Sequence, residues 1–216
     1  MFWTEDRLLW LARMIGIVGF GALVWSGIGG TIMASKSAGW LARRFPRASA
    51  FLKGSRLFSN HRRFSLIGAG LFLLHPIPML FAPHKTGGLS ISQVLIPFTA
   101  QKQTLYTGLG TLAFWTLLIV TLAAIATKKL PRKTWRALHY GVYVFLVMGL
   151  AHSLLISAEY RIEAELIDFE EPEKIILLIM GIAAAAFPLW RVFVARRLNT
   201  QKPLAPRGAT GDPLIP

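Results

Sequence analysis

Long uncharged apolar runs constrain this chain more than any other feature of its sequence. The 216 residues have a mean hydropathy of +0.50, and 54% of them are hydrophobic. A helix of about 20 apolar residues crosses the ~30 Å hydrocarbon core of a bilayer. We expect membrane spans at roughly 12–33, 64–83, 105–127, 137–157 and 174–193. The sequence therefore predicts an all-α integral membrane bundle of about five transmembrane helices.

Charge divides the connecting segments into a basic side and an acidic side. Eighteen of the 24 lysines and arginines fall in segments 34–63 and 128–136 and from Arg191 onward, whereas nine of the ten acids fall at the N-terminus or between the last two spans. The positive-inside rule assigns the basic side to the cytoplasm. We therefore expect a multi-pass protein of the cell (inner or plasma) membrane, with an extracytoplasmic N-terminus and a cytoplasmic C-terminus.

Composition also excludes several classes of protein. The net charge of +14 does not indicate a nucleic-acid partner, because the cations lie between apolar spans rather than in a soluble basic domain. The absence of cysteine excludes disulfides, thiolate metal sites, iron–sulfur clusters and heme attached through cysteine. The acidic head argues against a cleaved signal peptide. We expect one membrane domain over 1–198 and a disordered cytoplasmic tail over 199–216, which is rich in proline and glycine.

Four of the five histidines form two spaced pairs in or beside the predicted spans. His61 and His75 lie 14 residues apart, and His139 and His152 lie 13 apart. Each spacing corresponds to ~20 Å along a helix axis. If the two helices run side by side in the same direction, His61 meets His139 at one depth and His75 meets His152 at another. Since a heme iron satisfies two imidazoles at once, the pattern indicates two bis-histidine heme sites, one per leaflet.

Helical phase fits the first pair better than the second. At ~100° per residue, His61 and His75 share a helix face, whereas His139 and His152 lie ~140° apart on an ideal helix. The second helix therefore needs a local bulge, for which two glycines are available, or it approaches the two hemes from different sides. Prolines after His75 should bend the first helix near the outer site. Small residues beside both pairs leave room for a porphyrin, but they are equally typical of ordinary helix packing.

Cations near the histidines are candidates to bind the anionic heme propionates. Besides the four histidines, which we expect to be the metal ligands, the candidate cofactor-binding residues are Arg62, Arg63, Arg136 and Trp135. The tryptophan either covers the edge of the inner heme or anchors its span at the membrane interface. The nearest cationic candidates on the outer side are His84, Lys85 and Arg161.

Three segments carry a family resemblance. They are NHRRFSLIGAGLFLLHPIPMLF (60–81), IPFTAQKQTLYTGLGTLAFWTLLIVTLAAIATKKL (96–130) and TWRALHYGVYVFLVMGLAHSLL (134–155). The last is the most specific, with a Trp, a His three or four residues on, and a second His about one heme-pair spacing later. The chain thus resembles, over roughly 60–195, the ferric reductase-like transmembrane domain of iron reductases, NADPH oxidases and bacterial homologues. The resemblance implies two parallel helices that hold two b-type hemes, the inner one on His61 and His139 and the outer one on His75 and His152.

Two departures from that family's usual pattern affect the expected partners. Full-length reductases usually carry six spans and a fused cytoplasmic FAD and NAD(P)H module, whereas we count five spans and find no G-x-G-x-x-G motif. The resemblance then implies that a separate cytoplasmic flavin reductase, with its own FAD or FMN, or a membrane quinol loads the inner heme. The heme membrane subunit of the periplasmic methionine sulfoxide reductase system also lacks a fused flavin module and is similar in layout.

These features predict transmembrane electron transfer through two b-type hemes. The donor would be a cytoplasmic reductase or quinol, and the extracytoplasmic acceptor would be ferric iron, dioxygen or a periplasmic redox protein. The chain would then be the heme subunit of an oxidoreductase. The alternative is a non-catalytic heme-binding scaffold or an anchor subunit of a redox complex. A transporter with histidine proton relays would need acids inside the spans, and the predicted spans contain none.

Overall fold

The computed structural model describes residues 5–35, 37–83, 88–156 and 172–200, and this part of the chain is helical without strands. In chain order, the elements are α1 (Glu5–Ala34), α2 (Ala38–Arg44), the 3₁₀ turn η1 (Pro46–Ala48), α3 (Gly54–Leu74), α4 (Ile77–Phe81), α5 (Ile91–Leu95), α6 (Thr104–Ile125), α7 (Arg132–Leu155) and α8 (Pro172–Thr200). Within the described residues, five helices are long and apolar enough to cross a membrane. The prediction of an all-α bundle with five spans is therefore confirmed.

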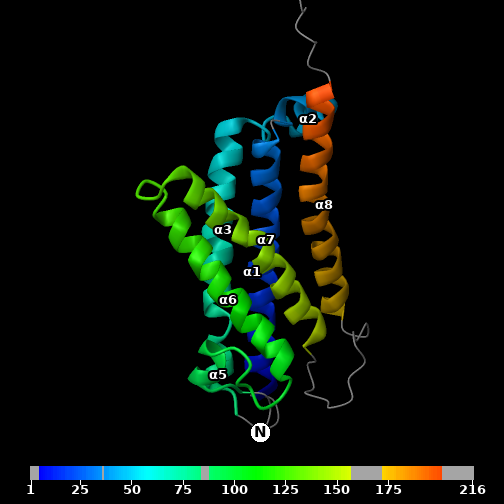
Figure 1. The fold of residues 1–216 in the computed structure, drawn as a ribbon. Helices are drawn as coiled ribbons and strands as arrows, with labels where there is room; N and C mark the ends of the chain where they lie inside the picture. Colours follow the sequence, from blue (N-terminus) through cyan, green and yellow to red (C-terminus); the bar gives the residue numbers. More distant parts are fainter. Residues whose placement is uncertain (1–4, 36, 84–87, 157–171, 201–216) are drawn as a thin grey trace, which may run out of the picture.

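The chain direction alternates between the long helices. Figure 1 shows α3 and α7 running from the upper end of the bundle to the lower end, while α1, α6 and α8 run upward. The two histidine-bearing helices are therefore parallel, as predicted. The start of α1 and the end of α8 lie at opposite ends of the bundle, which fits an odd number of spans. The described part of the predicted tail, residues 199–200, continues α8, and its remainder lies outside the described residues.

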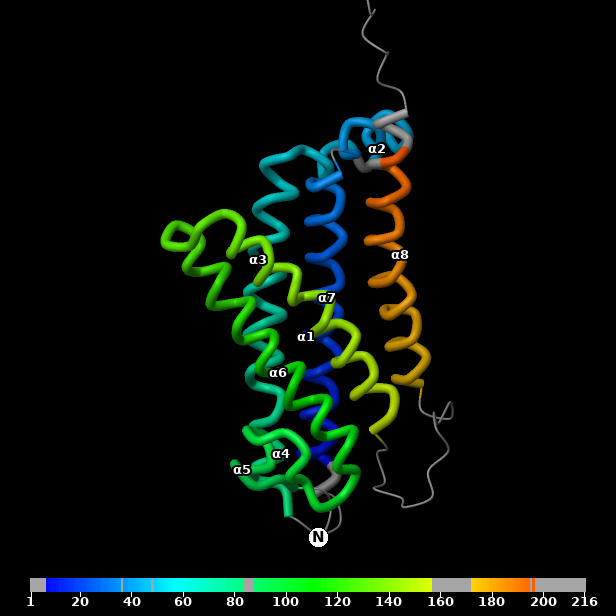
Figure 2. The backbone as a smooth tube through the Cα atoms, in the orientation of Figure 1, coloured from blue at the N-terminus to red at the C-terminus, as the bar shows by residue number. Residues whose placement is uncertain are grey.

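The second span differs from its predicted bounds at both ends. α3 begins at Gly54 rather than at 64, because helical hydrogen bonding continues through the polar stretch before the apolar run, where hydropathy gives no signal. α3 ends at Leu74, with His75 as its C-cap, and Pro76 precedes the short helix α4. The predicted break near the outer histidine is confirmed, since proline cannot continue the helical hydrogen-bond ladder. Figure 2 shows α4 and α5 at the same end of the bundle as the start of α6.

Of the two arrangements that the phase of His139 and His152 allowed, the structure does not have the local bulge. α7 is an uninterrupted α-helix from Arg132 to Leu155. In Figure 1 its axis is inclined to those of the antiparallel helices α1 and α3, so it does not follow α3 along its length. This inclination lets His139 and His152 face different sides of α7 and still approach the same neighbouring helix, which was the other arrangement compatible with their phase.

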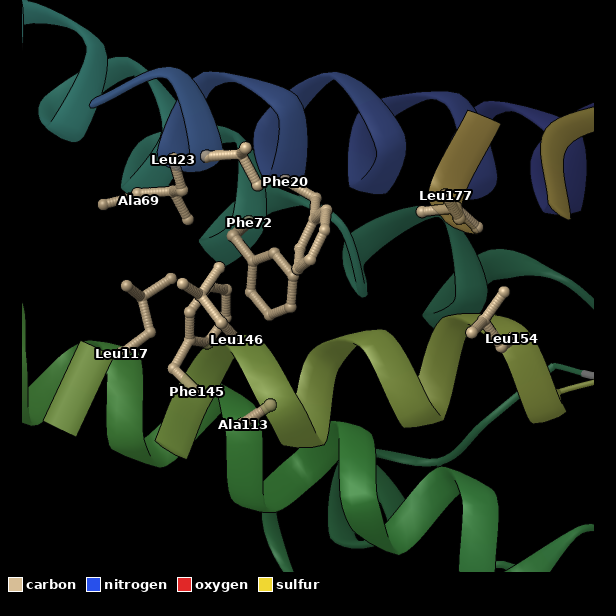
Figure 3. Close-up of a cluster of buried hydrophobic side chains, with 11 residues drawn as sticks. Phe20, Leu23, Ala69, Phe72, Ala113, Leu117, Phe145, Leu146, Leu154 and Leu177 are labelled. Carbon is tan, nitrogen blue, oxygen red and sulfur yellow. The ribbon is translucent and has the colours of Figure 1, made fainter. Parts of the chain in front are cut away.

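The two histidine helices pack mainly against other helices rather than against each other. α3 packs along α1, and α7 packs along α6. Between the two layers lies a buried aromatic cluster that Phe20, Phe72 and Phe145 contribute from α1, α3 and α7 (Figure 3). The Phe72 and Phe145 rings meet edge to face with centroids 4.9 Å apart, a favourable aromatic geometry. The cluster fills the middle of the bundle and leaves the histidines toward its two ends.

Small residues near the histidines of α3 serve helix packing. A Cβ added at Gly68 would lie 2.7 Å from Leu23 Cγ and 2.9 Å from the Gly19 carbonyl oxygen of α1. Gly68 therefore permits the close approach of α1 and α3, as small residues do in membrane bundles. A Cβ at Gly70 would meet nothing within 4 Å. Ordinary packing thus explains Gly68 without a porphyrin beside it.

Large apolar side chains cover the outside of the bundle. Ile119, Val147 and Ile179 are 51%, 69% and 61% exposed, respectively. Such surfaces suit lipid rather than water, since a bilayer solvates apolar side chains. At one end, Trp40 of α2 contacts Trp190 of α8 with ring centroids 5.8 Å apart. The lipid bilayer is therefore a partner of this multi-pass chain.

Candidate functional site

The structure brings the four histidines together in the two pairs that the spacing predicts. The ring centroids of His61 and His139 lie 6.2 Å apart, and their planes are inclined by 79°. The ring centroids of His75 and His152 lie 6.4 Å apart, with an inclination of 78°. We call these the inner pair and the outer pair. The two pairs have nearly the same geometry although the helices that carry them have different histidine spacings.

Three of the four histidines are oriented by backbone carbonyls of a neighbouring helix. The Nδ1 atom of His75 lies 2.6 Å from the Ala12 carbonyl oxygen, and that of His152 lies 2.8 Å from the Tyr106 carbonyl oxygen. The Nδ1 atom of His61 lies 2.9 Å from the Ser26 carbonyl oxygen. Because a carbonyl oxygen can only accept, Nδ1 carries the hydrogen in each of these rings. The Nε2 atom of a neutral ring is then left as a free acceptor.

Ser26 adds a hydroxyl to the inner pair. Its side chain is 3% exposed, and its Oγ lies 2.8 Å from His61 Nδ1 and 2.6 Å from Ser65 Oγ. The same Oγ lies 3.0 Å from the His61 carbonyl oxygen, to which it can donate. In the outer pair, Ala12 holds the corresponding position on α1 and carries no hydroxyl. Ser26 thus ties α1 to α3 at the inner histidine.

His139 differs from the other three histidines. Among the residues that the structure describes, its buried Nδ1 atom has no hydrogen-bond partner, and the same holds for Nε1 of Trp135. The two rings are stacked, with centroids 5.1 Å apart and planes inclined by 12°. Trp135 is half-buried against His139 rather than placed only at the interface. The orientation of His139 is therefore determined by ring stacking and not by a carbonyl.

A cavity of about 140 Å³ adjoins the outer pair. His75 and His152 line it, together with Arg13 of α1 and Glu173 and Lys174 of α8. Arg13 Nη1 and Glu173 Oε1 form an ion pair at 3.4 Å. Since its lining combines apolar side chains, two imidazoles and these charged groups, the cavity has the mixed character of a cofactor site.

Lys174 is a buried cation at the edge of this cavity. Its side chain is 4% exposed, and its Nζ donates to the carbonyl oxygens of Leu154 and Ile156 at 2.7 Å each. These carbonyls belong to the C-terminal end of α7, where carbonyls lack partners within the helix. Lys174 therefore fixes the end of α7 two residues after His152 and brings a positive charge beside the outer pair.

The predicted propionate partners lie at the surface, unlike the buried Lys174. Arg62, Arg63 and Arg136 are exposed at the inner end of α3 and α7. The Nη2 atom of Arg136 lies 3.3 Å from the Tyr140 hydroxyl, to which it donates. The outer candidates His84, Lys85 and Arg161 lie outside the described residues. The cations that the structure places beside the outer pair are instead Arg13 and Lys174.

Sequence reasoning missed the residues that orient the histidines. Ala12, Ser26 and Tyr106 act mainly through backbone carbonyls, which carry no side-chain signal. Arg13 and Lys174 were recognisable only as charges at the ends of spans. A spacing signal was present, since Ala12 and Ser26 lie 14 residues apart, as do His61 and His75. That match becomes meaningful once α1 and α3 are known to be neighbours.

No group of three or more histidine, aspartate or glutamate side chains is placed to hold a metal ion in the part of the chain that the structure describes. Each histidine pair offers two nitrogen ligands and no third protein ligand. The pairs therefore do not resemble a zinc site, which needs three or four protein ligands. Two nitrogen ligands suit a metal ion whose other ligands belong to a bound cofactor.

Comparison with known proteins identifies the family. No curated protein and no solved structure matches the chain significantly. Residues 38–150, which are more than half of the chain, match the ferric reductase like transmembrane component. This match includes α3, α6 and most of α7, and it leaves α1 and α8 outside. The chain therefore belongs to the ferric reductase like transmembrane components, a membership that indicates transmembrane electron transfer as its general activity.

Proposed function

We propose that this chain binds two b-type hemes and conducts electrons from a cytoplasmic donor to an extracytoplasmic acceptor. His61 and His139 would hold the inner heme, and His75 and His152 the outer heme. The observation that carries the proposal is the matched separation of the two ring pairs, 6.2 Å and 6.4 Å between centroids. A histidine nitrogen binds a transition metal at about 2 Å, so two imidazoles on opposite sides of one metal atom have ring centres about 6 Å apart.

The hydrogen bonds of the rings support the same proposal. Histidines that bind metals usually donate the hydrogen of their other ring nitrogen to a carbonyl or carboxylate. His61, His75 and His152 each have a carbonyl oxygen within 2.9 Å of Nδ1. This leaves Nε2 as the ligand atom in all three. A porphyrin supplies four ring nitrogens of its own, so two histidines per site complete the coordination without a third protein ligand.

The surrounding residues have distinct roles in this proposal. Heme supplies, when bound, an iron that accepts and returns one electron at a time. The two histidines of each pair would hold the iron between them and leave no position open for small ligands, which would suit electron transfer. Arg13 and Lys174 would balance negative charge at the outer site. The exposed residues Arg62, Arg63 and Arg136 would meet propionates at the inner site, and Trp135 would support the ring of His139.

The donor and acceptor are proposed from the chain's organisation. We propose a separate flavin reductase or a membrane quinol as the donor to the inner heme. Ferric iron, dioxygen or a periplasmic redox protein would be the acceptor. The basic segments 34–63 and 128–136 would face the cytoplasm under the positive-inside rule. The N-terminus would then be extracytoplasmic, and the inner pair would lie on the cytoplasmic side.

Sealed vesicles provide the test of electron conduction. Heme-loaded protein is reconstituted into vesicles that contain trapped ferricyanide, and dithionite is added outside. We expect the trapped ferricyanide to be reduced by the wild type and not by His139→Ala or His152→Ala, since each variant lacks one site. Empty vesicles are the control. Equal rates in wild type and in both variants would overturn the proposal, and heme-loaded wild type without any conduction would favour the non-catalytic scaffold or anchor subunit instead.

A further inference from the structure

The three carbonyls that orient histidines share one local arrangement. In each case a glycine stands four residues after the residue whose carbonyl accepts. The residues whose carbonyls accept, each with its glycine, are Ala12 with Gly16, Ser26 with Gly30, and Tyr106 with Gly110. Each glycine is also the position at which an added Cβ would meet the ring concerned. The arrangement therefore occurs twice on α1 and once on α6.

Helix geometry explains why the residue four positions after the accepting carbonyl must be small. The Cα–Cβ bonds of an α-helix tilt toward its N-terminus, so a side chain covers the turn that precedes it. The carbonyl of residue i already accepts from the N–H of residue i+4. A second donor must approach that carbonyl from the side, past the position that the side chain of residue i+4 would occupy. Glycine at i+4 leaves this approach open.

The distance from an added Cβ to the ring shows how tightly each histidine packs against its glycine. A Cβ at Gly110 would lie 2.6 Å from His152 Nδ1, and one at Gly16 would lie 2.9 Å from His75 Nδ1. A Cβ at Gly30 would lie 3.2 Å from His61 Cε1. The first two distances are shorter than Cβ contacts in real proteins, so the ring or the helix backbone beside it would have to shift. The third requires a smaller displacement.

The register of α1 against α3 makes the arrangement systematic. α1 runs antiparallel to α3 (Figure 1), and Gly16 and Gly30 lie 14 residues apart, the same spacing as His61 and His75. One helix therefore presents two glycines to two histidine rings that have the same spacing along their own helix. α1 lies outside the residues that match the family, which are 38–150.

We infer that Gly16, Gly30 and Gly110 are positioning residues that fix three histidines with Nδ1–H on a carbonyl and Nε2 toward the partner ring. α1 is then a part of both histidine sites. That these rings hold heme rests on the proposed function, whereas their orientation does not. His139 is the exception, since its buried Nδ1 has no hydrogen-bond partner in the described part of the chain.

Glycine-to-alanine variants test the inference, with Gly27→Ala on α1 as the matched control. A Cβ at Gly27 would meet nothing within 4 Å, and alanine is favoured over glycine in a helix, so this variant should behave as wild type. Gly110→Ala and Gly16→Ala should weaken the outer heme selectively, and Gly30→Ala the inner one. Changes to the groups that orient metal ligands cost about 10- to 100-fold in affinity. We expect the loss to rank Gly110→Ala, then Gly16→Ala, then Gly30→Ala.

Two readouts on the purified full chain separate the possible failures. Heme content with low-spin electron paramagnetic resonance signals reports which site is affected. Nitrogen-15 spectra of labelled histidine, recorded on protein prepared without heme, report whether Nδ1 or Nε2 carries the hydrogen. A wild type without heme would contradict the proposed function. The histidine spectra would still show whether the glycines fix the orientation of the three rings. Variants with wild-type histidine spectra and wild-type heme retention would overturn it.

Discussion

The inner and outer histidine pairs have the same ring separation but different support. In the outer pair, both Nδ1 atoms meet carbonyl oxygens, and Lys174 fixes the end of α7 just beyond His152. In the inner pair, His61 is held by Ser26, whereas His139 is held by stacking on Trp135. The outer site is therefore defined by directional hydrogen bonds on both rings. At the inner site, one ring is oriented by stacking on an indole instead of by a hydrogen bond to a carbonyl.

The largest effects should come from removing one histidine at a time. His152→Ala should abolish the outer heme and leave the inner one, while His139→Ala should do the reverse, because each site would then keep only one of its two histidines. The two hemes are distinguished by redox titration of the α band. Free imidazole added to each variant should restore the inner heme more readily, since the native ring there depends on no carbonyl. If both variants lost both hemes equally, the sites would not be separate.

Lys174→Met should have the next largest effect, confined to the outer end. The change leaves the carbonyls of Leu154 and Ile156 without this donor, and a buried unsatisfied polar group costs about 1–3 kcal/mol. Thermal unfolding followed by helical circular dichroism should show a lower midpoint. Loss of the positive charge should also lower the midpoint potential of the outer heme relative to the inner one. Lys174→Arg, which keeps the charge, is the control for that potential.

Ser26→Ala should affect the inner pair by a smaller amount. It removes the Oγ contacts with His61 and Ser65 but keeps the Ser26 carbonyl that orients His61. Side-chain hydrogen bonds between membrane helices contribute about 0.6 kcal/mol on average. We expect full heme content, a shifted inner potential and an unchanged outer potential. A shift of the outer potential of the same size would show that Ser26 acts on the whole bundle.

Trp135→Phe should have the smallest effect. It removes a buried N–H that has no partner and keeps an aromatic ring on His139, so the change in free energy of unfolding should be close to zero. Trp135→Ala removes the stack and should destabilise the inner heme. Heme retention during heating distinguishes the two. Equal retention in both variants would mean that the stack does not orient His139.

Much of the fold follows from the sequence because the membrane limits the choices. Apolar runs predict the five spans, and the histidine spacings predict which rings meet. Span boundaries were less accurate, since α3 extends into the polar stretch from Gly54. The inclination of α7 was not predictable, because it depends on how α6 and α7 pack together. A bulge was therefore considered where the structure has a continuous helix.

The immediate surroundings of the histidines were the least predictable part. Ala12 and Tyr106 contribute carbonyl oxygens, so no side-chain pattern distinguishes them. Gly16 and Gly30 are significant only in register with α3, which needs the pairing of α1 and α3 to be known. Lys174 is a cation at the start of a span, and its burial depends on where α7 ends. Residue identity alone reveals ligands better than it reveals the groups that orient them.

The heme-to-protein ratio of the purified chain tests the central claim most directly. It is measured by the pyridine hemochrome spectrum against quantitative amino-acid analysis, on protein from cells supplied with a heme precursor. The account predicts two low-spin b-type hemes per chain, one for each histidine pair. A ratio of one would contradict the assignment of one heme to each pair, and a ratio of zero would contradict the assignment of either pair to heme.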